Sequence, residues 1–181
     1  MSRPDRIARL CDGLSEWSGR AVAWLTAAMV AVTFAVVVLR YLFDTGSIAL
    51  QESVTYMHAL VFMVGAAYTL KHDGHVRVDI LYRRLGPRGR AAVDLAGTLL
   101  LLLPVCGFIL LASWDYVAES WALREGSREA GGLPGVFLLK TVIPVMALLL
   151  AVQGVSLALR SALILAGHPG AAPEHDGSRE I

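Results

Sequence analysis

Four long apolar stretches divide the chain, and polar residues gather between them. The apolar stretches cover residues 19–43, 50–70, 91–121 and 134–163. Each is long enough for a helix to cross the hydrocarbon core of a bilayer, which takes about 20 apolar residues. The pattern therefore predicts an all-α integral membrane protein with four transmembrane helices.

The polar flanks predict how the rest of the chain is organised. Residues 1–18 hold charged side chains and form the expected N-terminal segment outside the membrane. Residues 164–181 are rich in proline, glycine and charge, which is typical of a disordered tail. The four-helix membrane domain is expected over residues 19–163. Its first apolar stretch is too long for a cleaved signal peptide.

Composition favours a membrane protein and argues against a nucleic-acid-binding protein. Hydrophobic residues make up 56% of the 181, and the mean hydropathy is +0.59, above that of soluble domains. The net charge of +1 gives no excess of positive charge for a polyanion. The arginines lie beside the apolar stretches, so we expect membrane lipids, and no nucleic acid, as their partners.

The distribution of lysine and arginine predicts the orientation in the membrane. Short cytoplasmic loops carry an excess of these residues. Ten lie in the N-terminal flank and the 71–90 loop, against two in the 122–133 loop and none in the 44–49 loop. We therefore expect both termini and the 71–90 loop to be cytoplasmic.

The start of the 71–90 loop contains possible metal ligands. His72, Asp73 and His75 could chelate an ion, but Gly74 interrupts a helical arrangement and no fourth ligand is near in the sequence. The sequence therefore predicts no metal site and no cofactor.

The second half of this loop predicts a short amphipathic helix in the cytoplasmic interface. Its apolar face comprises Val78, Leu81, Tyr82 and Leu85, while Arg83 and Arg84 turn toward lipid headgroups. Residues 75–80 taken alone alternate like a strand, which is the competing interpretation.

Small residues recur along the first apolar stretch. Every fourth residue is alanine at Ala23, Ala27, Ala31 and Ala35. This spacing places them on one helix face, where another backbone can approach closely. The alternative is a chance recurrence in an alanine-rich membrane helix.

Two charged residues flank the turn between the first two stretches. Arg40 lies just inside the boundary, and Glu52 opens the second stretch. We predict that Arg40 pairs with Glu52; the alternatives are that Arg40 extends outward to water or reaches a partner subunit, and Asp44 is a competing acceptor.

A histidine in the second stretch raises the possibility of haem. A bis-histidine haem would need a second ligand beside His58, but the other predicted spans contain no histidine. A hydrogen bond to a neighbouring helix is the favoured interpretation.

The outer end of the third stretch carries a pair of carboxylates. Asp115 and Glu119 share a helix face and precede Arg124 and Arg128 in a glycine-rich loop. Paired carboxylates can act as acid and base, but this pair lies where water reaches it. A solvated surface facing a periplasmic partner is the better interpretation.

The charged residues all lie near predicted membrane boundaries, and no enzyme motif is present. A transporter that acts alone would place ionisable groups in mid-membrane. The sequence therefore predicts a non-enzymatic accessory subunit. Two alternatives are a haem-carrying electron-transfer subunit and a small stand-alone exporter that uses Glu52 as its proton site.

Four sequence features together resemble a known family. They are "RYLF" at 40–43, Glu52, "GAAYTL" at 65–70 and "GHVRVDI" at 74–80. In this order and spacing the chain is similar to the DctQ-type small permease of tripartite ATP-independent periplasmic (TRAP) transporters. The resemblance marks the following residues as structural or interface candidates: Arg40, Tyr41, Glu52, Gly65, Tyr68, Gly74, His75, Arg77 and Asp79.

The resemblance implies a complex in the bacterial inner membrane. A large, DctM-type permease would carry the sodium and solute sites, and this chain would scaffold it. A periplasmic solute-binding protein would deliver the solute, an organic anion such as a carboxylate. Uptake would be driven by a sodium gradient.

Overall fold

The computed structural model describes residues 3–76, 79–82 and 84–167, although the side chains of residues 3–5, 79 and 81 are outside that description. Its elements are α1 (Arg3–Leu42), α2 (Ile48–Lys71), α3 (Asp79–Tyr82), α4 (Pro87–Gly97), the π-helical turn η1 (Thr98–Leu102), α5 (Leu103–Ala122) and α6 (Val136–Leu165). The described part of the chain contains no strand.

Four helices are long and apolar enough to cross a membrane. They are α1, α2, the continuous run α4–η1–α5, and α6. The prediction of an all-α protein with four membrane-spanning helices and a short helix after the second is confirmed.

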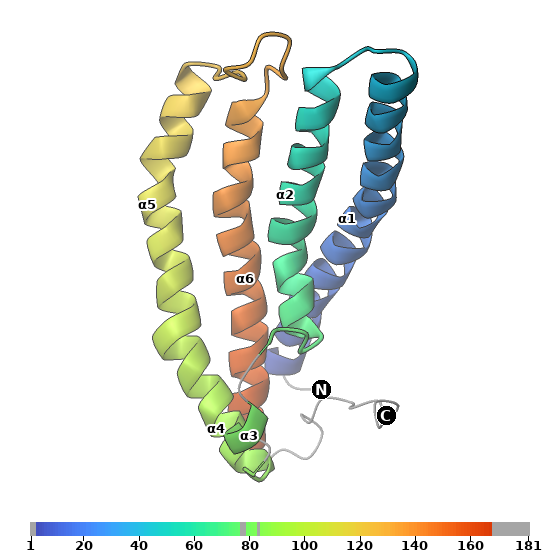
Figure 1. The fold of residues 1–181 in the computed structure, drawn as a ribbon. Coiled ribbons are helices and arrows are strands. Elements are labelled where there is room, and N and C mark those ends of the chain that lie inside the picture. Colours follow the sequence, from blue (N-terminus) through green and yellow to red (C-terminus); the bar gives the residue numbers. More distant parts are fainter. Residues whose placement is uncertain (1–2, 77–78, 83, 168–181) are drawn as a thin grey trace.

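The four long helices form an open row rather than a closed ring (Figure 1). The order across the row is α5, α6, α2 and α1, so α6 and α2 are the inner helices. One end of the row, the terminal end, holds the start of α1, the end of α2, the start of α4 and the end of α6. The opposite end, the loop end, holds the 43–47 and 123–135 loops.

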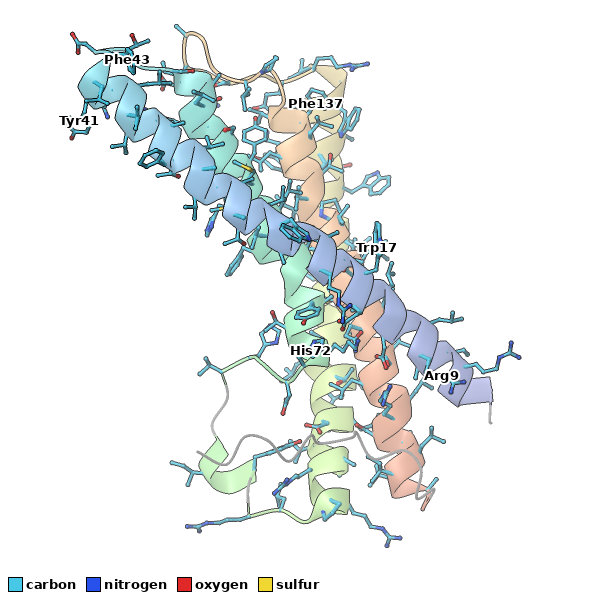
Figure 2. The ribbon with its side chains drawn as sticks, turned by 90° about the vertical axis from the view of Figure 1, so that its right-hand side faces the viewer. Arg9, Trp17, Tyr41, Phe43, His72 and Phe137 are labelled. Carbon is cyan, nitrogen blue, oxygen red and sulfur yellow. The ribbon has the colours of Figure 1, made fainter. Side chains whose placement is uncertain are left out.

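Helix α1 is inclined to the rest of the row (Figure 2). Its first half crosses α6 and α2 at the terminal end, and its second half packs against α2. Pro4 fits the first turn of this 40-residue helix, where a missing N–H costs no hydrogen bond. The segment expected outside the membrane domain, residues 1–18, is therefore helical from Arg3 onward and continuous with the first span.

The third span contains one turn of π-helix directly before Pro104. The N–H of Leu103 donates to the carbonyl of Thr98, five residues earlier. Proline cannot donate to the preceding turn, and its ring displaces that turn's carbonyl, so a wider turn next to it is physically reasonable. The wide turn packs on Gly154 of α6, where a Cβ would lie only 2.9 Å from Leu102 Cδ2.

Helix α5 turns a face of small side chains toward α6. Cys106, Ser113 and Ser120 are buried and recur every seven residues. Small side chains allow two helices in a membrane to approach closely. The same helix leaves large side chains outward, Phe108 and Trp114 among them.

Helix α3 lies within the stretch for which the sequence predicted an interfacial helix. Its Tyr82 hydroxyl donates to Asp94 of α4 at 2.7 Å, and the Arg90 guanidinium lies 5.6 Å from the centre of the Tyr82 ring. Tyr82 is thus attached to the third span. Val78 and the side chain of Leu81 lie outside the described residues, so the predicted apolar face stays a prediction.

Candidate functional site

A buried carboxylate joins α1 to α6 at the terminal end. Asp12 accepts hydrogen bonds from Gln153 Nε2 at 3.0 Å and Ser156 Oγ at 2.7 Å, and it pairs with Arg160. The three donors follow one another at intervals of three and four residues, so they share one face of α6. Ser15 completes the group by donating to Gln153 Oε1 at 2.7 Å. We call these five residues the α1–α6 cluster.

The α1–α6 cluster is buried apart from Arg160, whose side chain is 36% exposed. Gln153 is 4% exposed and Ser156 is fully buried. A carboxylate is expensive to bury unless it is paired and hydrogen-bonded, and Asp12 has both kinds of partner. The cluster therefore holds the first half of α1 against α6.

A second carboxylate on α1 reaches α2. Glu16 accepts from Lys71 Nζ at 2.6 Å and from Arg20 Nε at 2.7 Å, and His72 Nε2 lies 3.3 Å away. Lys71 is the last residue of α2, so this contact lies at the terminal end. Asp12 and Glu16 together attach one helix to two neighbours.

Close backbone packing continues one turn further along α1. A Cβ on Gly19 would lie 2.4–2.5 Å from the Cβ, Cγ and Cδ2 atoms of Tyr68. Glycine is therefore required there for α1 and α2 to approach as they do. Tyr68, which the sequence marked as an interface candidate, is an internal contact between helices.

At the loop end, Glu52 holds the loop between α5 and α6. Its carboxylate accepts from the backbone N–H of Leu133 at 2.6 Å and from the Ser127 hydroxyl. Gly132 lies so close that a Cβ there would be 2.8 Å from Glu52 Oε1. The start of α2 thus fixes a loop that lies some 80 residues later in the chain.

The structure does not form the expected pair of Arg40 with Glu52. Both carboxylate oxygens of Glu52 already accept hydrogen bonds from the 127–133 region. Arg40 and Tyr41 lie exposed in the last turn of α1. Arg40 and Asp44, both described, form no ion pair, which leaves outward exposure or a partner subunit as the interpretations of Arg40.

A second carboxylate at the loop end joins α5 to α6. Glu125 accepts from Ser120 Oγ at 2.6 Å and pairs with Lys140, whose Nζ lies 3.9 Å from the centre of the Tyr116 ring. The hydrogen bond from Lys140 holds the pKa of the Glu125 carboxyl below its ordinary value, with a smaller contribution from Ser120. Nearby, Trp121 Nε1 donates to Thr141 Oγ1 at 2.8 Å.

The alanine face of α1 points away from the other helices. Ala23, Ala27 and Ala31 are exposed, and Ala35 is half-buried. The face is therefore not used within this chain. Whether it packs on a partner stays a prediction.

The other candidates in the middle of the chain are scattered. Gly65 has no side chain or neighbouring backbone within 4 Å of a Cβ position, and Gly74 lies close to Thr69 alone. His75 is exposed. Arg77 and the side chain of Asp79 lie outside the described residues.

The charged candidates at the loop end are exposed. Asp115 and Glu119 lie on the surface of α5, and Arg128 is exposed in the following loop. The Arg124 guanidinium lies 5.8 Å from the centre of the Phe137 ring. These side chains are available to a partner at the loop end.

Among the described residues, no three His, Cys, Asp or Glu side chains are grouped in a way that could hold a metal ion. His58 is exposed on α2, with its ring 6.3 Å from that of Phe62.

Sequence reasoning did not find the terminal-end contacts. Their signal is a run of small and polar residues on one face of α1, together with Gln153, Ser156 and Arg160 on one face of α6. Each run by itself is typical of a solvated helix end. The two runs bond to each other because α1 crosses α6, and this crossing is not visible in the sequence.

Comparisons with known proteins find two relatives. The C4-dicarboxylate TRAP transporter small permease protein DctQ of Vibrio cholerae is 30% identical over 111 residues, which cover 61% of this chain and 46% of that protein. A putative TRAP transporter small permease protein of Haemophilus influenzae is 30% identical over 90 residues, which cover 50% of this chain and 55% of that protein. The chain thus spans about half the length of these curated relatives.

No solved structure matches the chain. A family model does match, over residues 29–163, and it describes the DctQ component of tripartite ATP-independent periplasmic transporters. This match covers well over half of the chain and includes parts of all four spanning helices. The family is one of transporter permeases and not of enzymes. The chain belongs to the DctQ family of tripartite ATP-independent periplasmic transporters, as a multi-pass membrane protein.

Proposed function

We propose that this chain is a membrane scaffold, which binds a large DctM-type permease and does not itself hold solute or ion. The observation that carries the proposal is the state of four carboxylates that are buried or half-buried. Asp12, Glu16, Glu52 and Glu125 are each bonded by donors from this same chain. Carboxylates occupied in this way stabilise the packing of helices and loops, and they are not free to coordinate a transported ion.

The proposed solute is a C4-dicarboxylate or a related organic anion. The similarity to the Vibrio cholerae protein, whose name carries C4-dicarboxylate, supports this choice. A periplasmic solute-binding protein delivers the anion, and the large permease carries the sodium and solute sites. A sodium gradient drives the uptake.

The proposed orientation places the terminal end in the cytoplasm of the bacterial inner membrane. The support is the excess of lysine and arginine at that end. Cysteines at Gly46 and Ala130, in a background without Cys11 and Cys106, should react with an impermeant thiol reagent in whole cells. Both positions are exposed, and neither side chain would disturb Glu52. Labelling of Arg84→Cys instead would reverse the orientation.

Two surfaces are proposed for the partners. The exposed alanine face, Ala23 to Ala31, suits a helix of the large permease, because small side chains allow close approach. The exposed charges at the loop end suit the solute-binding protein. They are Asp115, Glu119, Arg124 and Arg128.

Reconstitution in liposomes tests the scaffold. The three proteins together should take up a C4-dicarboxylate when a sodium gradient is imposed, and omission of this chain should abolish uptake. Substantial uptake without the chain would contradict the proposal. Uptake or export by the chain alone would favour the stand-alone exporter instead, with Glu52→Gln as its test.

A matched pair of variants tests the alanine face. Ala27→Leu with Ala31→Leu adds bulk to an outward face of α1, and it should weaken co-purification with the large permease. Ala112→Leu makes one substitution of the same kind at an exposed position of the other outer helix, α5, and should leave co-purification unchanged. If only Ala112→Leu weakened co-purification with the large permease, the interface would lie on α5.

A further inference from the structure

The first half of α1 has an inner face that is fully used by this chain. Ala8, Asp12, Ser15 and Gly19 are buried or in close contact with α6 and α2. All are small or polar. This inner face is the reverse of an ordinary amphipathic helix, whose large apolar side chains turn inward.

The large apolar side chains of this half turn outward. Ile7, Leu10, Leu14 and Trp17 follow one another at intervals of three and four residues, which places them along one stripe. Leu10 is 75% exposed and Trp17 is 69% exposed. Trp24, 79% exposed, continues the stripe seven residues further. No described part of the chain covers it, so something apolar from outside must.

The level of this stripe relative to the membrane follows from two ion pairs. Asp12 pairs with Arg160 near the end of α6, and Glu16 pairs with Lys71 at the end of α2. Residues 12–16 therefore lie where α6 and α2 leave the membrane. Residues 21–39 hold no charged side chain, and this length of helix spans about 28 Å, close to the hydrocarbon thickness. The stripe is thus at the boundary between acyl chains and headgroups.

Positive charges lie beside the stripe on the same half-helix. Arg6, Arg9 and Arg20 are exposed, and helical spacing places them in the sector next to the stripe, on the side away from Ser15. Figure 2 shows where Arg9 and Trp17 lie along this part of α1. Arginine beside leucine and tryptophan is the pattern of a helix that lies in the membrane interface and attracts anionic lipids.

A comparison of two faces of α1 indicates whether lipid or protein covers the stripe. Surfaces that pack on another membrane helix are rich in small residues, as the Ala23, Ala27 and Ala31 face is. The stripe has long, flexible or aromatic side chains flanked by cations. It therefore fits fluid acyl chains beneath phosphate groups better than it fits a helix.

We infer that the first half of α1 is an interfacial lipid-binding arm. Ile7, Leu10, Leu14 and Trp17 enter the acyl layer, while Arg6 and Arg9 lie against anionic phospholipid headgroups. Asp12 and Glu16 fix this arm to α6 and α2, so its lipid contacts set how the whole row is seated in the bilayer. The inference holds for either orientation of the chain and does not depend on the solute.

Nitroxide labels on the full-length chain in vesicles test the arm. Leu10→Cys and Leu14→Cys place a label on the stripe, and Gly13→Cys places one toward the arginine side, where a Cβ meets nothing within 4 Å. Cys11 and Cys106 are replaced by alanine in all three. Oxygen should relax the labels at 10 and 14 more strongly than a water-soluble nickel chelate does, and the order should reverse at 13.

Anionic lipid tests the role of the arginines. Oxygen accessibility at position 10 should rise when phosphatidylglycerol is added to phosphatidylcholine vesicles. The double variant Arg6→Gln with Arg9→Gln should remove that rise. An unchanged rise would overturn the electrostatic part of the inference.

Two results would overturn the arm itself. One is stronger relaxation by the nickel chelate at positions 10 and 14, which would place the stripe in water. The other is protection from both reagents, appearing only with the large permease or at high protein density, which would make the occupant a protein or a second copy. A measurement without labels is the control in case the labelled variants misfold. Brominated acyl chains should quench a smaller part of the total tryptophan fluorescence in Trp17→Phe than in the unaltered chain.

Discussion

The terminal end and the loop end both use buried or half-buried carboxylates, but the carboxylates connect different things. At the terminal end, Asp12 and Glu16 bond to side chains of α6 and α2, so they join one helix to another. At the loop end, Glu52 bonds to the 127–133 region, so it joins a helix to a loop. The contacts at the terminal end therefore fix how α1 is inclined, whereas Glu52 fixes the shape of the 127–133 loop.

This difference predicts how far a disturbance spreads. A change at the terminal end acts on α1, α2 and α6 together, because one short part of α1 contacts both neighbours. A change at Glu52 releases loop backbone and leaves the helix crossings in place. Substitutions at the two ends should therefore differ in both the size and the kind of their effects.

The largest effect is expected from Asp12→Ala. The change leaves Arg160, Gln153 and Ser156 without their common acceptor, and the free energy of unfolding should fall by about 2–4 kcal/mol. The lower part of the usual range applies because the Arg160 side chain is 36% exposed and can reach water. Equilibrium unfolding in mixed micelles measures the loss.

Asp115→Ala is the matched control for that measurement. It removes an exposed carboxylate, and the free energy of unfolding should change by less than about 0.5 kcal/mol. Asp12→Asn should fall between the two, because its amide oxygen can still accept a hydrogen bond. Equal losses for Asp12→Ala and Asp115→Ala would remove the special role of the α1–α6 cluster.

A smaller but still global effect is expected from Gly19→Ala. Its Cβ would overlap the base of the Tyr68 side chain, which cannot swing away, so α1 and α2 must separate. The expected loss is about 1–3 kcal/mol in the same assay. Gly13→Ala on the same helix meets nothing within 4 Å and should stabilise the chain by up to about 1 kcal/mol. Opposite signs at the two glycines would confirm the close contact.

A local effect is expected from Glu52→Gln. The amide keeps one acceptor oxygen and loses the other, so one of the bonds from Ser127 and Leu133 is weakened. Amide hydrogen exchange over residues 126–133 should speed up several-fold, with no change in α1. Glu129→Gln, in the same loop, should leave exchange unaltered. Faster exchange in α1 would contradict a purely local role.

The smallest effect is a pH dependence at Glu125. The folded chain lowers the pKa of this carboxyl, so the pair with Lys140 stabilises the loop end above the ordinary Glu pKa of 4.5 and is lost as the pH falls through the lowered value. Trp121 fluorescence should therefore stay constant from pH 7 to about 5 and change only in stronger acid. Glu125→Gln should abolish the acid change. A transition near neutral pH would require another group.

The spans were predictable because hydrocarbon thickness sets their length and their apolar character. The short helix after α2 was also predictable from the spacing around Tyr82. The role of Asp12 and Ser15 could not be predicted. A polar helix end has the same kind of sequence whether it faces water or packs against another polar helix. Their burial depends on α6, more than 130 residues away in the chain.

The contacts of Glu52 were missed for a related reason. Arg40 was the nearest cation along the chain, and proximity in sequence favoured a pair. The loop that supplies Ser127 and Leu133 is rich in glycine, which favours a mobile interpretation when no partner is known. Almost every residue has a backbone N–H, so the sequence does not indicate that the N–H of Leu133 would bond to Glu52. Only the fold shows this contact.

The π turn in the third span determines the direction in which the side chains of α5 point. The extra residue in the turn sets the side chains of α5 back by about 100° relative to an uninterrupted α-helix of the same sequence. Cys106, Ser113 and Ser120 point at α6 because of that offset. Deleting one residue from 98–102 should therefore close the wide turn into a regular α-helix and leave all three facing α6. Deleting one residue from 107–112, where no extra residue absorbs the change, should instead rotate Ser113 and Ser120 away from α6.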